Sequence, residues 1–284
     1  MADTWHFYPK LMDERQLWIS FNESYDDIAE SDSRENLLRI EIKLKKPTRE
    51  GMPTNEEYEK LCALEDIIVD AVCSTNGVFV GRVTYDGRRY YSFYFSCSRS
   101  ELSSLLHPIL DQSGYKARFV MEHDPQKLFY WQMLYPSDDD WQMIRDLLTL
   151  DQLNKHGDNK GIARQVFHWV YFTEQEQVDD FSDWLVQECY QFQSVTEQDE
   201  QFCVRFYHIG TMRLSDISSH TLKIARSVGE LGGEYDGWES SVEKLEVKEE
   251  VNTHIDDKEA KGDEVSKEEK VDLIQRFKNW TQHP

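Results

Sequence analysis

Apolar and polar residues alternate along several stretches of the first half of the chain, as they do in strands with one buried and one solvated face. From residue 38 to residue 44, apolar side chains occupy every second position and charged side chains lie between them. The alternation predicts strands over residues 17–21, 38–44, 78–85, 89–95, 115–122 and 128–135, of which the last two would form a hairpin around Asp124-Pro125.

Two segments of the same region have the spacing of helices instead. Thr54 with Glu57, and Ser98 with Glu101, form the capping boxes that begin helices. Apolar residues then recur at helical intervals beyond each capping box. Residues 1–136 are therefore predicted to form an α+β domain, an antiparallel sheet with two helices on one face.

The strand pattern breaks at residues 137–156, where the apolar residues have helical spacing. The spacing predicts a connecting helix over 138–155, with Ser137 or Asp138 as its N-cap. Three consecutive aspartates at 138–140 could be taken for metal ligands, but no second set of ligands lies near them in the sequence. Carboxylates in a first turn suit the helix dipole, so capping is the favoured interpretation.

The second half shows a β-α-β-β-α-β order, which is typical of the ferredoxin-like fold. We predict this domain over 157–247, an antiparallel sheet with two helices on one face. Right-handed crossovers would leave the other face for a partner or for the first domain. Lysine and glutamate then dominate a charged tail at 248–284, in which a short amphipathic helix is predicted near the end.

The chain of 284 residues has 32 basic and 54 acidic side chains, a net charge of −22. Direct nucleic-acid binding is therefore not expected, because a protein that grips phosphates normally presents a basic face. Arg82, Arg88 and Arg89 lie among tyrosines and could form a stacking surface for single strands, although a solvated hairpin has the same composition. The acidic charge suits a protein partner with a basic surface, or it serves only to keep the chain in solution.

Cysteine usage and hydropathy predict a cytoplasmic protein. The five cysteines are odd in number and have no paired spacing, so we expect buried thiols in a reducing compartment. No apolar run approaches the ~18 residues of a membrane span, and no apolar signal segment follows Met1.

Catalytic signatures are missing from the sequence. It has no zinc-ligand spacing, phosphate-binding loop, dinucleotide fingerprint or nucleophile elbow, so no cofactor and no metal are predicted. His168 and His208 could form an acid/base pocket together with Asp236 and Glu239. A hydrolase or other small-molecule enzyme with a site between the domains is therefore the alternative function, although hydrogen-bonded strand histidines are the favoured interpretation.

An acidic-aromatic run at 234–239 combines three carboxylates with Tyr235 and Trp238. Such a run is a poor catalytic motif and a plausible binding edge. If it binds a partner, Asp236 and Glu239 should be exposed, while Tyr235 or Trp238 anchors the strand.

The first half resembles the bacterial domain of unknown function 695. The matching pieces are an early strand at Trp5, Gly51-Met52-Pro53 before the first helix, Val80-Gly81-Arg82 in the hairpin, and a closing Trp131 to Pro136 segment. The resemblance implies a domain boundary and no activity, because that family has none assigned.

The second half resembles the regulator of ribonuclease activity B family, from Gly157-Asp158-Asn159 to Tyr235-Asp236-Gly237-Trp238. That family implies a small acidic cytoplasmic bacterial protein that binds a ribonuclease E and restrains RNA decay without being a nuclease. The chain departs from it by its extra N-terminal domain and its charged tail. With the resemblance, partner binding is assigned to Asp158, Glu234, Tyr235, Asp236, Trp238 and Glu239.

Overall fold

A computed structural model of the chain describes residues 3–12 and 15–244. The chain divides into two compact units, the first ending at Asp140 and the second beginning at Trp141. Each unit contains one antiparallel sheet with helices beside it, which confirms the predicted α+β class. The predicted tail at 248–284 lies outside the described residues.

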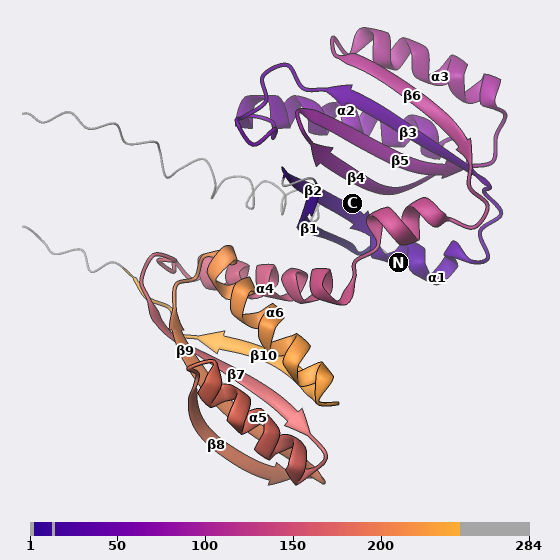
Figure 1. Cartoon of the computed structure of the whole chain (residues 1–284). Coiled ribbons are helices and arrows are strands. Elements are labelled where there is room, and N and C mark those ends of the chain that lie inside the picture. Colours follow the sequence, from indigo (N-terminus) through magenta and orange to yellow (C-terminus); the bar gives the residue numbers. More distant parts are fainter. Residues whose placement is uncertain (1–2, 13–14, 245–284) are drawn as a thin grey trace, which may run out of the picture. The chain divides into compact units, whose positions relative to one another are not determined.

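The first unit is built on a six-stranded sheet in the order β1-β2-β4-β5-β3-β6 (Figure 1). All neighbouring strands are antiparallel. The strands are β1 (Trp5–Met12), β2 (Arg15–Asn22), β3 (Asn36–Lys43), β4 (Val78–Tyr85), β5 (Arg88–Phe95) and β6 (Lys116–His123).

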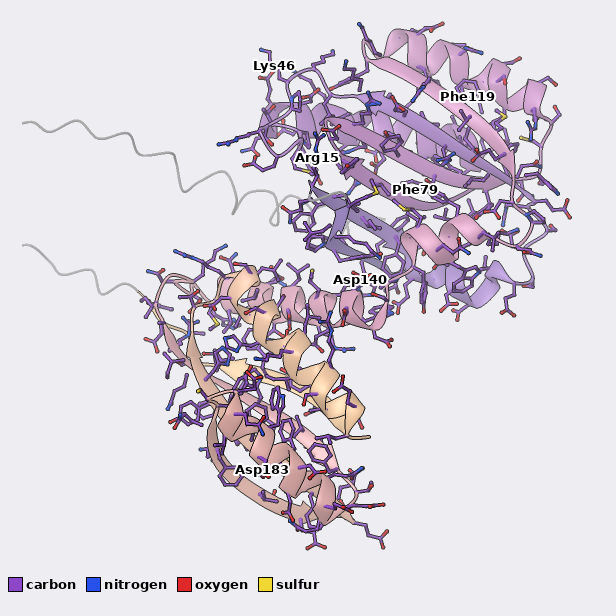
Figure 2. All side chains as sticks on the ribbon, viewed as in Figure 1. Arg15, Lys46, Phe79, Phe119, Asp140 and Asp183 are labelled. Atoms are coloured by element: carbon purple, nitrogen blue, oxygen red, sulfur yellow. The ribbon has the colours of Figure 1, made fainter. Side chains whose placement is uncertain are left out.

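Two helices cover one face of this sheet, α2 (Asn55–Cys73) and α3 (Arg99–Gln112). Their buried leucines, Leu61 and Leu106 among them, form one hydrophobic core with the strand residues Leu38 to Ile42 and Phe95. Phe79 joins the same core and lies 4.8 Å from Phe93, measured between ring centroids (Figure 2). The alternating pattern of β3 therefore has its apolar side toward the helices.

Residues 128–135 are not the strand that their alternation predicts, but a helical turn that includes the π-helix η2 (Tyr130–Leu134). The cause is Asp124, whose carboxylate accepts hydrogen bonds from the backbone N–H groups of Leu128 and Phe129 at 2.9 and 3.0 Å. It thereby satisfies the first donors of a helical turn. Tyr130 and Leu134, one turn apart, are both fully buried.

This helical turn lies on the sheet face opposite α2, together with η1 (Glu23–Tyr25) and α1 (Asp26–Ala29). The turn approaches the backbone of β4 closely, since a Cβ on Gly81 would lie 2.7 Å from Leu134 Cδ1. Tyr8 from β1 donates to the Leu134 carbonyl at 3.0 Å. Both faces of the first sheet are thus at least partly covered by the chain itself.

The second unit contains β7 (Arg164–Phe172), α5 (Gln175–Gln187), β8 (Gln191–Gln198), β9 (Gln201–Gly210), α6 (Leu214–Glu230) and β10 (Glu234–Ser240). Its sheet order is β10-β7-β9-β8, with every neighbouring pair antiparallel. This order, with the β-α-β-β-α-β sequence of elements, confirms the ferredoxin-like architecture.

Three helices, rather than the predicted two, pack on one face of the second sheet. Figure 1 shows α5 and α6 on the same side, and both contribute to the core around Phe206. The third is α4 (Asp138–Lys155), which begins after Ser137, and the side chains of Ser137 and Asp140 are hydrogen-bonded across its first turn. Its Leu150 packs beside Val166 and Trp238. The helix predicted as a connector therefore supplies part of the second unit's core.

The cysteines are free thiols, but the prediction that they are buried is wrong. Cys62, Cys97 and Cys203 are half-buried, and Cys73 and Cys189 are exposed. The last two lie at helix C-termini, where the apolar stripe has already ended. In the described part of the chain, no helix is both long enough and apolar enough to span a membrane.

Candidate functional site

The acidic-aromatic run forms β10, which lies at one end of the sheet and, among the strands that the structure describes, pairs only with β7. Glu234, Asp236 and Glu239 are exposed, Tyr235 is half-buried, and Trp238 is 8% exposed. A bulge between Tyr235 and Gly237 turns two successive residues outward, and Gly237 adopts the φ of +143° that this needs. One strand therefore presents three carboxylates to solvent and two aromatic side chains to the helices.

Trp238 is anchored by a buried carboxylate that sequence reasoning missed. Its Nε1–H donates to Asp146 Oδ1 at 3.0 Å, while Ser218 and Thr221 donate to Oδ2 at 2.9 and 2.6 Å. Burial raises the pKa of Asp146, and the hydrogen bonds to its carboxylate oppose that rise. This network ties α4 and α6 to β10, so the strand has a fixed position.

Tyr235 leads into a second network, made of histidines. Its hydroxyl lies 2.8 Å from His168 Nδ1, and His168 Nε2 lies 2.9 Å from His208 Nδ1. The ring of His208 stacks on that of His220 at 3.7 Å between centroids, and His220 Nδ1 lies 2.8 Å from the hydroxyl of Tyr190. Sequence reasoning paired His168 with His208 but missed His220, which reaches them from α6.

Burial disfavours the charged form of all three histidines. Burial lowers the pKa of His168 well below its ordinary value, and a proton on His208 or His220 would lower it further. Burial, followed by the influence of His220, lowers the pKa of His208 to about 4, while the charge of Asp216 opposes this. Burial also lowers the pKa of His220. A neutral imidazole donates one hydrogen bond and accepts one, so Tyr235, His168 and His208 can form one chain of hydrogen bonds. His220 meets His208 by ring stacking alone, and His208 Nε2 has no hydrogen-bond partner among the described residues.

The expected carboxylate partners of His168 and His208 do not reach them. Asp236 and Glu239 point to solvent, and Glu239 accepts a hydrogen bond from Arg205 at 3.3 Å. His168 has no exposed surface. The arrangement stabilises the core and offers no contact between His168 and a dissolved molecule.

Asp158 occupies a different place from the other residues assigned to partner binding. Its side chain is 3% exposed and accepts hydrogen bonds from Arg164 at 2.6 Å and from the backbone of Glu243 at 2.8 Å. Arg164 also donates to Ser240, the last residue of β10. Asp158 therefore fixes the segment that follows β10.

The arginines of the β4–β5 hairpin in the first unit do not share one surface. Arg82 donates two hydrogen bonds to Glu65 of α2, and both side chains are buried. Arg89 is 2% exposed, with its Cζ 5.3 Å from the ring centroid of Tyr58. Arg88 instead pairs with Glu41 at 3.4 Å on the outside of the sheet. The residues that suggested a stacking surface are thus divided between core and solvent.

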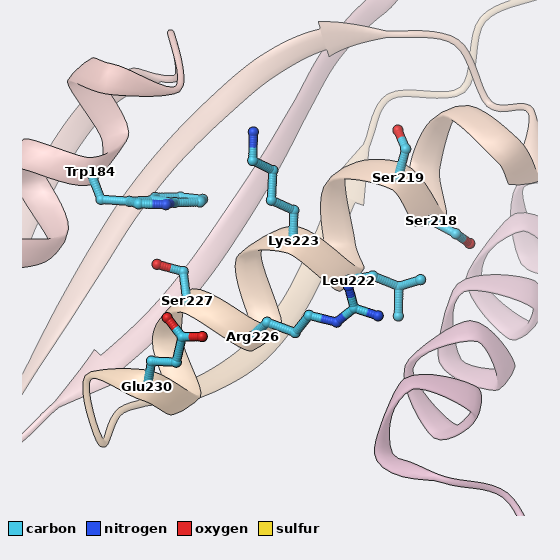
Figure 3. Close-up of a pocket in the computed structure, with 8 residues that line it drawn as sticks. All are labelled: Trp184, Ser218, Ser219, Leu222, Lys223, Arg226, Ser227 and Glu230. Atoms are coloured by element: carbon cyan, nitrogen blue, oxygen red, sulfur yellow. The ribbon is translucent and has the colours of Figure 1, made fainter.

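A shallow groove of about 410 Å³ lies over α6 in the second unit (Figure 3). Trp184 of α5 forms one wall, and Lys223, Arg226 and Glu230 extend from α6. Lys223 forms an ion pair with Glu188. In the parts of the chain that the structure describes, no three His, Cys, Asp or Glu side chains are placed to hold a metal ion.

Two different family models match the two halves of the chain. The family model described as a family of unknown function, DUF695, matches residues 3–135, and that of the regulator of ribonuclease activity B matches residues 144–240. Both resemblances seen in the sequence are thereby confirmed. The second match begins inside α4, in agreement with the place of this helix in the second core. A search of curated proteins found no match.

Two solved structures align over most of their length but superpose poorly. A putative glycine cleavage system transcriptional repressor is 11% identical, covers 72% of this chain and 98% of its own, and has a TM-score of 0.22. An unknown protein from Galdieria sulphuraria is 8% identical, covers 73% and 99%, and has a TM-score of 0.20. At these TM-scores neither structure carries an argument about fold or function.

Proposed function

We propose that this chain is a non-catalytic regulatory protein whose second unit binds another protein, with a ribonuclease E-type enzyme of RNA degradation as the first candidate. The proposal is supported by the match of residues 144–240 to the regulator of ribonuclease activity B. The observation that carries it is β10, an edge strand that exposes Glu234, Asp236 and Glu239 while Trp238 fixes it from below.

A partner with a basic surface fits this strand. Exposed carboxylates on a rigid edge attract a cationic segment and speed its encounter without large changes of shape. The chain as a whole carries a net charge of −22, which adds a long-range attraction for a positively charged partner. The same charge opposes the approach of RNA itself, so the proposed target is the enzyme and not its substrate.

The enzymatic alternative is not favoured. A hydrolase would need His168 or His208 as its acid or base, yet His168 has no exposed surface and the pKa of His208 is lowered to about 4. Both histidines lie within a network that includes Tyr235. Their geometry is that of core residues.

The test is capture of the purified ribonuclease by the full chain at graded salt, with RNA cleavage measured in parallel. Glu239 already pairs with Arg205, so the informative variant is Glu234→Lys with Asp236→Lys. Asp180→Lys with Asp183→Lys on α5 is the control, because it changes the net charge equally at another exposed surface.

We expect capture to weaken once the Debye length falls below about 10 Å, and to weaken further in the β10 variant than in the control. RNA cleavage should slow only where capture occurs. Absence of a complex at low salt, or equal capture by both variants, would overturn the proposed function.

A further inference from the structure

The face of the second sheet opposite the helices is rich in aromatic side chains. Phe167, Trp169 and Tyr171 occupy alternate positions of β7 and are all half-buried. On β9 their partners across the sheet are Tyr207, Arg205 and Cys203. Helices α4, α5 and α6 pack on the other face, through residues such as Val166, Phe206 and Trp238, so no described helix of this unit covers the aromatic row.

This face already holds one guanidinium group. Arg205 Cζ lies 4.6 Å from the ring centroid of Phe167 and 4.9 Å from that of Trp169, which places it against both rings. Its Nη2 also donates to Glu239 of β10 at 3.3 Å. Two aromatic rings and one β10 carboxylate thus bind one arginine side chain by stacking and charge.

The same arrangement repeats one step along β7, without an arginine of its own. Trp169 and Tyr171 are two residues apart, as Phe167 and Trp169 are, so their side chains leave the same face of β7 roughly 7 Å apart along the strand. On the β9 side the residue opposite Tyr171 is Cys203, which is not a cation. On the β10 side the neighbouring residue is Glu234, and Asp236 follows at the bulge.

The carboxylates at this second position are close enough to act on Tyr171. A hydrogen bond with Cys203 is the main cause that raises the pKa of Tyr171, and the charges of Asp236 and Glu234 raise it further. None of the ion pairs found among residues 3–12 and 15–244 includes Glu234 or Asp236. Opposite Trp169, β10 supplies Gly237, where even a Cβ would meet nothing within 4 Å.

We propose that the gap between Trp169 and Tyr171, flanked by Glu234 and Asp236, binds an arginine side chain from an extended segment of a protein partner. The internal Arg205 shows the chemistry that such a residue would find there. Lysine would satisfy the carboxylates but stacks less well, because its ammonium is compact and strongly hydrated. A nucleic-acid base could stack on the same rings, but its phosphates would meet the carboxylates.

This inference rests on the proposed function, and it adds the identity of the recognised side chain. The test is titration of the full chain with three probes: an eight-residue peptide of alternating serine and arginine, the same peptide with lysine, and an eight-nucleotide oligouridylate. Tyr171→Leu removes one stacking ring, and Glu234→Gln with Asp236→Asn removes the charge. Asp180→Asn with Asp183→Asn, on the outer side of α5 where Figure 2 labels Asp183, is the matched control.

We expect the arginine peptide to bind roughly fivefold or more tightly than the lysine peptide. Tyr171→Leu should reduce that ratio toward one, whereas the Glu234 and Asp236 variant should weaken both peptides and the control neither. Equal binding of the two peptides, preference for the oligouridylate, or an arginine preference that survives Tyr171→Leu would overturn the inference.

The two proposals can fail separately. If the ribonuclease is captured through β10 but Tyr171→Leu leaves capture and peptide selectivity unchanged, only the arginine site is wrong. If the arginine peptide is selected as expected but the ribonuclease is not captured, the proposed partner is wrong and the surface chemistry stands.

Discussion

In the first unit, α2 and α3 cover one face of the sheet while η2 and its neighbours cover part of the other; in the second, α4, α5 and α6 all lie on one face. In the first sheet Tyr91 and Tyr94 are fully buried, whereas Phe7 of β1 and Trp18 of β2, whose ring centroids lie 5.7 Å apart, are half-buried. The second sheet leaves Trp169 and Tyr171 half-buried beside acidic side chains. The two sheets therefore differ in how far the described helices and turns of their own unit cover the second face.

The two cores also hold their polar groups in different ways. The first buries a charged pair, Arg82 with Glu65. The second also buries a charged pair, Arg164 with Asp158, and adds the histidines His168 and His208 and the carboxylate of Asp146. Buried charges depend on their partner, and buried neutral histidines depend on pH. Loss of a charged partner should therefore destabilise the first core, and acid should destabilise the second.

The largest effect is expected from Glu65→Leu, which leaves the guanidinium of Arg82 buried without its carboxylate. The first unit should lose about 3–5 kcal/mol of unfolding free energy. The double variant Glu65→Leu with Arg82→Met should recover most of this loss, because it removes both charges. Urea unfolding, with hydrogen exchange to separate the units, measures both values. A single variant within 1 kcal/mol of the parent would contradict the prediction.

Acid should weaken the second unit first. Since the folded-state pKa of His208 is lowered to about 4, the unfolded chain binds more protons below pH 6.5, and stability falls as pH drops from about 6.5 to 4. This histidine alone accounts for roughly 3 kcal/mol over that range. His208→Gln should flatten the dependence.

The first unit offers the contrasting case. The pKa of Asp32 is lowered by hydrogen bonds from Tyr25 and Arg34, which outweigh the opposing, and largest single, effect of burial. Its contribution to stability is therefore present above pH 4 and lost only below it. If hydrogen exchange shows both units weakening together between pH 6.5 and 4, the distinction between the two cores is wrong.

A smaller effect is expected from Trp238→Phe, which keeps a ring in the core but removes the donor to Asp146. The loss of this bond to a buried carboxylate should cost about 1–3 kcal/mol. Trp238→Ala should cost more, about 3–5 kcal/mol, because it also opens a cavity. A thermal melt of each variant gives the order of their stabilities. If Trp238→Phe and Trp238→Ala lost equal stability, the additional cost of the cavity would be absent and the prediction would be wrong.

The smallest effect on stability belongs to the surface. Glu234→Lys with Asp236→Lys should change the unfolding free energy by less than about 0.5 kcal/mol, because both side chains are exposed. Its effect should appear in partner capture alone. If the variant were unfolded at pH 7, these two side chains would contribute to stability, and the assignment of their role to the surface alone would be wrong.

The sequence predicted those features that depend on local periodicity. The strands around residue 40 and in the second unit and the helix after Ser137 follow from spacing that repeats every two or about 3.6 residues. Of the two predicted capping boxes, Ser98 accepts a hydrogen bond from the Glu101 N–H at 3.2 Å. Thr54 makes no side-chain cap, because Glu57 accepts hydrogen bonds from the backbone N–H groups of Lys45 and Lys46 instead.

The exposure of Glu234 and Asp236 in β10 follows from alternation, whereas that of Glu239 depends on the bulge between Tyr235 and Gly237. The structure has the exposure expected of Asp236 and Glu239. Whether that strand binds a partner stays a prediction.

Features that depend on contacts between distant residues were not predictable in this way. The turn after Asp124 is helical because the Asp124 side chain caps it, and the alternation of apolar and polar residues gives no sign of this hydrogen bond. His220 joins His168 and His208 across 52 and 12 residues of sequence, from a helix whose pattern gives no sign of them. In the sequence Asp146 is one of several acidic residues of its helix, and its role depends on the hydrogen bond from the indole N–H of Trp238, which is distant in the sequence.

The bulge at Gly237 has a consequence for the behaviour of the protein at high concentration. An edge strand with unpaired backbone groups invites another copy of the same sheet to extend it, and a flat edge invites it most. In β10 the bulge interrupts the regular row of backbone donors and acceptors. If two copies met at this edge, Glu234, Asp236 and Glu239 of one copy would be repelled by the same carboxylates of the other. Both features disfavour the extension of the sheet through this edge by a second copy.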